Sequence, residues 1–197
     1  MAGYRRPSAP FNAEYEVKKS RFIVDLLPCQ GDHKATLAQI RQQHPKAGHH
    51  CWAYRIGDGL DQDSSDDGEP RGTAGKPMAA MLQGLEVGDC LAVISRYFGG
   101  IKLGTGGLVR AYSQSLRSAI EACPMHAVEP TFQLTLSFAY DQSGYAESLR
   151  RSLDAEVLSS EFTVRCCQTW QVAMAQGPAL LALIQAQAHL GFKIHKQ

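Results

Sequence analysis

The feature that most limits how this chain can fold is a strand–glycine–helix unit in its middle. The residues from Cys90 to Phe98 are almost continuously apolar, which is typical of a strand buried on both faces. Five glycines lie within the nine residues 99–107, and apolar residues then recur at helical spacing from Leu108 to Ile120. Because a buried strand and an amphipathic helix must pack in layers, we expect an α+β protein.

The rest of the first two thirds of the chain supplies more strands and helices. Strand patterns lie at 13–18, 21–27 and 50–56, and helical patterns begin after Gly31-Asp32 and at Pro77. Residues 1–10 hold two prolines and little apolar content, which predicts a loose arm. The segment 57–75 has no large apolar residue apart from Leu60, which predicts one long loop, and such loops are usually functional or disordered.

The pattern changes near residue 127, where we place a domain boundary after a linker at 125–130. Beyond it we expect a strand at 132–139, a helix at 142–153, strands at 156–164 and 169–175, a helix at 178–189 and a strand at 191–195. This βαββαβ order is the ferredoxin-like plan, with two helices on one face of a sheet. The expected parts are therefore an arm at 1–14, a first domain at 15–126 and a ferredoxin-like domain at 127–197.

Composition and charge limit the class of protein. Apolar residues make up 44% of the 197 residues and charged residues 20%, which is enough for a core and argues against wholesale disorder. The formal net charge is +1, so any RNA binding must come from a local patch. The sequence has neither an apolar run of about 18 residues nor a signal-peptide pattern at its start, so we expect a soluble cytoplasmic protein.

The six cysteines agree with a reducing compartment. Their even number is compatible with disulfides, but Cys51 and Cys90 lie in apolar strand-like runs. Cys166 and Cys167 are adjacent and poorly placed to bridge each other. We therefore expect six reduced, mostly buried thiols.

The first glycine-rich segment runs from Ser65 to Lys76. It ends at an expected helix N-terminus, where free N–H groups favour an anion and Lys76 adds a full charge. A P-loop is excluded because Pro70 stands where its first glycine belongs and Pro77 replaces the Ser/Thr. An EF-hand starting at Asp61 is excluded as well, since Asp66 and Gly72 stand in place of its glycine and glutamate. The alternative is a solvated acidic loop with an ordinary helix cap.

The second glycine-rich segment, 98–107, leaves the buried strand and enters the long helix. This is the context of an anion cradle, and Arg96, Lys102 and Arg110 bracket it. The glycines permit close approach of the backbone to a ligand. The alternative is a flexible turn with a glycine-rich cap.

Other candidate residues lie in the strand at 50–56 and just before it. His49-His50-Cys51 has no second ligand pair at zinc spacing, so we expect no structural zinc site. A buried, inert Cys51 is favoured over a nucleophile. Trp52, Tyr54 and Tyr97 are suited to stacking on bases, but aromatic residues in strands more often belong to the core.

Two strings of residues carry a family resemblance. They are Ser-Asp-Asp-Gly-Glu-Pro at 65–70 with Gly-Thr-Ala-Gly-Lys-Pro at 72–77, and the segment 96–108. Lys18–Phe22 and His49–Cys51 agree with them. Through these residues the chain resembles the YigZ/IMPACT family, with an IMPACT domain over about 15–125 and a remainder similar to the small C-terminal domain of bacterial YigZ members.

The resemblance implies a first domain with the fold of a small-subunit ribosomal protein domain, an α/β sandwich shared with some translation factors and with GHMP-type small-molecule kinases. The second domain would resemble the ferredoxin-like domains of elongation factor G. Eukaryotic relatives regulate translation by binding the activator of a stress-responsive initiation-factor kinase. They do so with an extra N-terminal domain that has no counterpart in this sequence, so that partner is not carried over.

We therefore expect a translation-associated regulatory or RNA- and ribosome-binding protein, without a cofactor or a bound metal, rather than an enzyme. The expected binding residues carry a charge, a hydroxyl group or an open backbone: Asp66, Asp67, Glu69, Arg71, Thr73, Lys76, Arg96, Tyr97, Gly99, Gly100, Lys102, Gly104, Thr105, Gly106, Gly107 and Arg110. One alternative is an enzyme acting on a phosphorylated or anionic small molecule, in which Asp66, Asp67 and Glu69 hold Mg²⁺ or act as a base. The other is a protein–protein adaptor without catalysis.

Overall fold

The computed structural model describes residues 3–31, 33–57, 59, 61–178, 180 and 193–196. The chain divides into two compact units, Ala2–Val128 and Glu129–Gln197. The division lies next to the position at which the sequence pattern changes. None of the described helices has both the length and the apolar content that crossing a bilayer requires.

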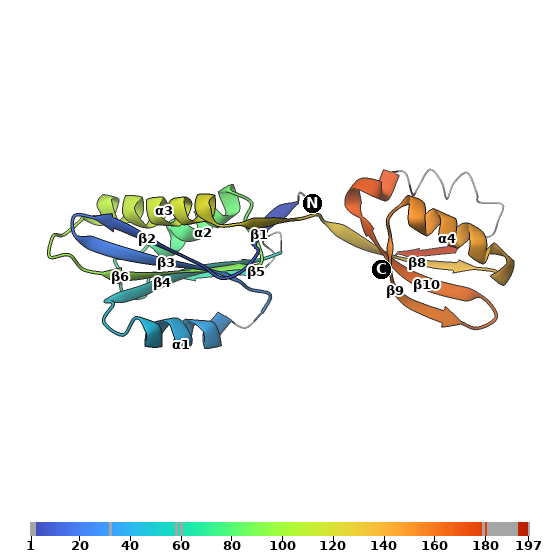
Figure 1. Cartoon of the computed structure of the whole chain (residues 1–197), viewed down its shortest axis with the longest axis horizontal. Coiled ribbons are helices and arrows are strands. Elements are labelled where there is room, and N and C mark those ends of the chain that lie inside the picture. Colours follow the sequence, from blue (N-terminus) through green and yellow to red (C-terminus); the bar gives the residue numbers. More distant parts are fainter. Residues whose placement is uncertain are drawn as a thin grey trace. The chain divides into compact units, whose positions relative to one another are not determined.

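The first unit is built around an antiparallel sheet of five strands in the order β2-β3-β6-β4-β5 (Figure 1). The strands are β2 (Phe11–Val17), β3 (Ser20–Pro28), β4 (His49–Ile56), β5 (Asp61–Ser65) and β6 (Cys90–Tyr97). The apolar run that dominates the sequence is therefore the central strand, β6.

Helices cover both faces of this sheet. Figure 1 shows α2 (Gly75–Gly84) and α3 (Thr105–Ala122) on one face and α1 (His33–Gln43) on the other. Side chains of β6 alternate between the two layers: Ile94 packs with Phe22 and Tyr112 under α2 and α3, whereas Val93 packs with Ile40 under α1. This confirms that β6 is buried on both faces.

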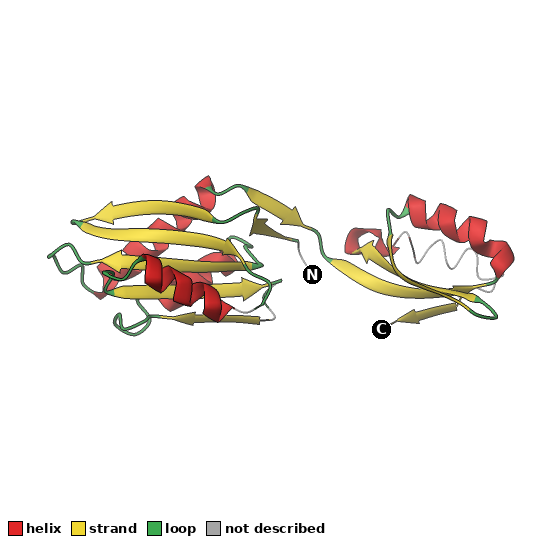
Figure 2. Ribbon diagram, turned by 60° about the horizontal axis from the view of Figure 1, so that its bottom comes forward, coloured by secondary structure: helices red, strands yellow, loops and turns green. Residues whose placement is uncertain are grey.

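The second unit contains a four-stranded antiparallel sheet in the order β11-β8-β10-β9. Its elements are β8 (Thr131–Phe138), α4 (Ser143–Ser152), β9 (Glu156–Phe162), β10 (Cys166–Ala173) and β11 (Lys193–Lys196). Leu149 of α4 packs on Leu134 and Trp170 of the sheet, and Figure 2 shows α4 along one face of it. The mixed helix and strand content predicted for the chain is thus confirmed. The helix expected at 178–189 falls almost wholly outside the described residues, so the ferredoxin-like order stays a prediction.

Three short strands form where the sequence predicts none. β1 (Tyr4–Pro7) lies in the expected arm and pairs antiparallel with β7 (Met125–Val128), which lies in the expected linker. β5 lies inside the segment expected to be one long loop and pairs with the edge of β4. These three predictions are wrong because backbone hydrogen bonds at a sheet edge do not require apolar side chains, and β5 exposes most of its residues.

All six cysteines are free thiols, as expected, and only Cys167 among them is not buried.

Candidate binding cleft at the start of α3

The two glycine-rich segments meet in one cavity, here called the glycine cleft. Its volume is ≈ 360 Å³. Glu69 and Pro70 come from the first segment; Phe98, Lys102, Leu103, Gly104 and Thr105 come from the second, and Arg96 and Leu108 flank it. Both signs of charge therefore face a single cleft at the N-terminus of α3.

A buried ion pair forms the inner wall of the glycine cleft. Glu69 Oε1 accepts hydrogen bonds from Arg96 Nη1 at 2.6 Å and from the Tyr112 hydroxyl at 2.8 Å. The side chains of Glu69 and Arg96 are 3% and 8% exposed. His49 Nε2 lies 4.0 Å from the second oxygen of Glu69. Since a carboxylate and a guanidinium at this depth must be paired, Glu69 holds Arg96 in place.

Arg96 still has unused hydrogen-bonding capacity. Its Nε is buried and has no hydrogen-bond partner among the described residues. Its guanidinium lies over the rings of Phe22, at 5.7 Å, and Phe98, at 5.8 Å. A buried donor without a partner is costly. Arg96 lines the cleft as a cation that Glu69 already pairs, and its Nε is shielded from solvent.

The N-terminus of α3 is open. Its N-cap residue, Gly104, has no side chain that could accept a hydrogen bond from the N–H groups of the first turn. Gly104 has a φ of 73°, which favours glycine. A Cβ built on Gly106 would meet no atom within 4 Å. The first turn of α3 thus has no side-chain cap and begins in the cleft beside Lys102, an arrangement that attracts an anion.

The N-terminus of α2 differs from this. The carboxylate of Asp66 accepts hydrogen bonds from the backbone N–H groups of Gly72 at 2.7 Å, Ala74 at 2.9 Å and Gly75 at 2.9 Å. The anion site predicted beside Lys76 is thus filled by a carboxylate of the protein itself. Asp66 therefore caps α2 from within the preceding loop, although the N-cap residue itself, Ala74, makes no side-chain cap.

This cap shapes the acid–base behaviour of Asp66. Burial alone raises the pKa of Asp66, but the three N–H donors and the charge of Lys76 outweigh it, so that the net pKa lies below the ordinary value. A lowered pKa in the folded state means that ionised Asp66 stabilises the fold.

We expect Asp66→Asn to lower the free energy of unfolding by about 2 kcal/mol at neutral pH, because a neutral amide replaces a charged acceptor of three N–H groups. The contribution of the carboxylate is fully present above its unfolded pKa of about 4 and is lost as the pH falls through the folded pKa. In urea denaturation, the difference between wild type and variant should therefore shrink between about pH 7 and pH 3. Exposed Asp141→Asn is the control, with little expected change; an equal Asp66→Asn effect at both pH values would contradict this account.

The remaining predicted residues of the first segment lie outside the glycine cleft. Asp67 forms an ion pair of 2.6 Å with Arg41 and accepts the backbone N–H of His50 at 2.7 Å. Thr73 is buried, and its hydroxyl donates to the Pro70 carbonyl at 2.7 Å. Arg71 and Lys76 are exposed and are not among the cleft residues.

These contacts bear on the enzyme alternative. The carboxylates of Asp66, Asp67 and Glu69 are each engaged by donors of the protein itself. Across the described residues, no group of three or more His, Cys, Asp and Glu side chains is placed to hold a metal ion. The residues present therefore do not fit a Mg²⁺ site.

Several predicted residues in and around the second segment do not line the glycine cleft. Tyr97 points to the α1 side of the sheet, where its hydroxyl lies 3.0 Å from His44 Nδ1. A Cβ on Gly99 would lie 2.1 Å from the backbone of Lys19, so this glycine permits the β2–β3 hairpin to pack. Gly100 has a φ of 84°, which a turn requires. Arg110 lies on α3 outside the cleft, with Nε donating to the Gly106 carbonyl at 3.3 Å.

Sequence reasoning missed Phe98 and Tyr112. Phe98 is 60% exposed at the cleft, and the signal for it was an aromatic residue between a cation and two glycines. Tyr112 belongs to the apolar face of the helix and packs in the core, but its hydroxyl also donates to Glu69. The Cys51 thiol donates to the Tyr112 hydroxyl at 3.3 Å. Burial raises the pKa of Cys51 to about 12, so this thiol is not poised as a nucleophile.

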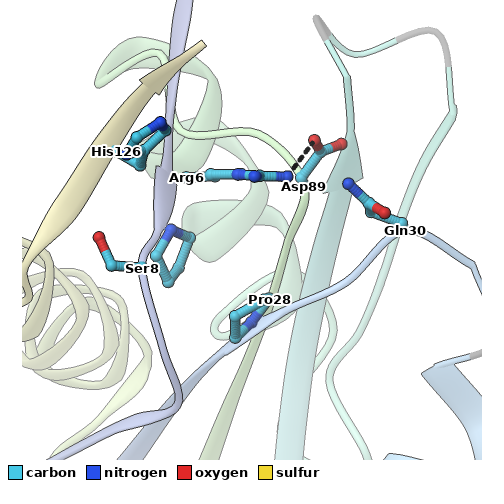
Figure 3. Close-up of a pocket in the computed structure, with 7 residues that line it drawn as sticks. Arg6, Ser8, Pro28, Gln30, Asp89 and His126 are labelled. Atoms are coloured by element: carbon cyan, nitrogen blue, oxygen red, sulfur yellow. Dashed lines mark ion pairs between the residues drawn. The ribbon is translucent and has the colours of Figure 1, made fainter.

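A second cavity of ≈ 400 Å³ lies near the start of β6 (Figure 3). The glycine cleft, in contrast, follows the end of β6. Arg6 and His126, which are neighbours in the β1–β7 pairing, line it together with Asp89. Asp89 is already engaged: it accepts the Tyr4 hydroxyl at 2.7 Å and the Gly57 N–H at 2.8 Å, with Arg6 at 4.0 Å. None of the predicted binding residues lines this cavity.

Comparison with known proteins points to one family. The Impact N-terminal domain family matches residues 18–120. A Haemophilus influenzae protein named an IMPACT family member is 44% identical over 167 residues, covering 82% of this chain and 81% of that protein. The Escherichia coli IMPACT family member YigZ is 41% identical over 167 residues, covering 82% of each chain. A crystal structure described as that of a hypothetical protein shares 35% identity and a TM-score of 0.69, covering 100% of this chain and 98% of the other.

Proposed function

This chain belongs to the IMPACT family, and we propose that it is a translation-associated protein that binds RNA phosphates, including those of the ribosome, through the glycine cleft. The observation that carries the proposal is the open N-terminus of α3 beside Arg96, Lys102 and the exposed ring of Phe98.

Each part of the glycine cleft supplies one element of nucleotide recognition. The N–H groups at the start of α3 and the charge of Lys102 favour a phosphate. Arg96 lies in the wall of the cleft, where its ion pair with Glu69 fixes its position. Phe98 offers a ring on which a base can stack, and stacking tolerates any base sequence.

The charge of the whole protein agrees with a local site. With 20 Lys and Arg against 19 Asp and Glu, the chain has no general attraction to nucleic acid. A role in translation is what the YigZ/IMPACT resemblance implies, and RNA phosphates are the ligand class that translation and this cleft share.

We expect Phe98→Ala to weaken binding of a fluorescent oligoribonucleotide by about 1–3 kcal/mol, or roughly 5- to 150-fold, because one stacked base loses its platform. Lys102→Gln should weaken binding and lower the slope of log affinity against log salt by about 0.7. Fluorescence anisotropy at several salt concentrations, with oligoribonucleotides and with purified ribosomes, measures both effects.

Matched controls exist for each variant. Phe162 is 65% exposed in the second unit, so Phe162→Ala removes an equally exposed ring away from the glycine cleft. Lys46 is exposed in the turn that follows α1, so Lys46→Gln removes one charge away from the glycine cleft. Binding that is insensitive to salt, or that responds equally to the control variants, would remove the RNA hypothesis.

A further inference from the structure

A third cavity continues from the glycine cleft along α3. It has a volume of ≈ 590 Å³ and lies between α3, the end of β2 and one residue of α2; we call it the basic groove. Leu103 lines both cavities. Thr105 lies in the glycine cleft, whereas Gly107 and Arg110 line the basic groove, so that the two adjoin at the first turn of α3.

The lining of the basic groove, which consists wholly of described residues, carries one sign of charge. Lys18, Arg110 and Arg117 line it, and no carboxylate does; Glu121, which lies 3.9 Å from Arg117, is outside the lining and 65% exposed, so water screens that pair. Glu14 and Glu16 belong to the same strand as Tyr15 and Val17, but alternate residues of a strand point to opposite faces. In a protein with nearly equal numbers of acids and bases, this segregation marks a surface for an anion.

The shape of the groove favours an extended anion over a small one. Arg110 and Arg117 are separated by seven positions of α3, which corresponds to about 10 Å along the helix axis. Together with Lys18, which lines the same groove, they match several phosphates of a chain rather than one phosphate.

The groove also has an apolar floor. Tyr15, Val17 and Leu103 line it and are partly buried against the core. A duplex presents its phosphates and keeps its bases stacked inside, whereas a single strand presents bases that can lie on such a floor. The apolar floor therefore selects a single strand.

We infer that a single strand of RNA runs from the glycine cleft along α3 into the basic groove, with Lys18, Arg110 and Arg117 contacting its backbone. This inference rests on the proposed function and deepens it, since it names single-stranded RNA as the ligand class.

The test uses the full chain and labelled oligouridylates of about 2, 4, 8 and 12 nucleotides, with an RNA duplex of about 12 base pairs for comparison. Wild type should bind more tightly as the strand lengthens to about 8 nucleotides, and should bind the duplex at least about tenfold more weakly. The variant Arg110→Gln with Arg117→Gln should bind the 2-mer as wild type does. It should bind the 8-mer about tenfold more weakly, with a salt slope lower by about 1.4.

The control variant, Lys46→Gln with Arg151→Gln, removes two exposed charges elsewhere and should bind every strand as wild type does. Glutamine is a good helix former, and circular dichroism verifies that both double variants fold. If the groove variant keeps the full gain with length while Phe98→Ala still weakens binding, the basic groove is not the path and the proposed function stands. Tighter binding of the duplex, or equal competition by a polyglutamate of the same charge, would also overturn the single-strand path. If no oligonucleotide binds, the proposed function fails as well.

Discussion

Replacing Glu69 with leucine is expected to lower the free energy of unfolding by about 3–5 kcal/mol, the cost of leaving a buried charge without its partner. Arg96 then remains as a cation with 8% of its side chain exposed and with no carboxylate at 2.6 Å. The Tyr112 hydroxyl loses its acceptor in the same step. Burial raises the pKa of Tyr112, so the hydroxyl stays protonated and keeps its donor without a partner.

The unpaired cation accounts for this loss only if removing Arg96 as well restores stability. The double variant Glu69→Leu with Arg96→Met should recover much of it, because no buried charge is then left without a partner. Urea denaturation of wild type, both single variants and the double variant forms a cycle that isolates the coupling between the two side chains. A double variant no more stable than Glu69→Leu would contradict the account.

Glu147 provides the matched comparison. It pairs with Arg150 and Arg151 at 2.8 Å each, but in the open: Arg151 is 75% exposed. Water screens such a pair, so Glu147→Ala should cost far less than Glu69→Leu although it breaks two ion pairs. The contrast tests burial, not the number of ion pairs, as the source of the effect.

Elements that bury apolar side chains were predictable from the sequence. The run from Cys90 is the central strand β6, and the apolar face that begins at Leu108 lies on α3. Hydrophobic periodicity reports which residues leave water, and these elements are held by that burial. Their boundaries followed within a few residues.

Elements held by backbone pairing alone were not predictable. β5 places Asp61 and Asp63 in solvent, so nothing in its composition distinguishes it from a loop. β1 and β7 pair across more than a hundred residues of sequence. A local pattern contains no information about a partner that far away.

The site was predictable in part for a related reason. Both glycine-rich segments end at helix N-termini, and from the sequence both attract anions equally. In the structure the carboxylate of Asp66 caps the N-terminus of α2, whereas the N-terminus of α3 has no side-chain cap. Such a capping contact spans six to nine residues and is settled by the path of the loop.

Two glycines of the second segment are expected to respond oppositely to substitution by alanine. Gly99→Ala should lower the free energy of unfolding by about 3 kcal/mol, because its Cβ would lie 2.1 Å from the backbone of Lys19, and backbone cannot yield as a flexible side chain can. Gly106→Ala should raise it by about 0.5–1 kcal/mol, since a helical glycine with nothing within 4 Å gains helix propensity and meets no clash. Thermal and urea unfolding of the two variants measure both changes.

Binding then separates the packing role of glycine from a role in recognition. If an RNA phosphate lies against the first turn of α3, the methyl group of Gly106→Ala occupies part of its place, and the variant should bind the 2-mer about tenfold more weakly while unfolding at a higher temperature. Loss of affinity in a more stable protein cannot be attributed to damage of the fold. Unchanged affinity of Gly106→Ala would instead place the phosphate away from the start of α3, because the added methyl group would then not touch it.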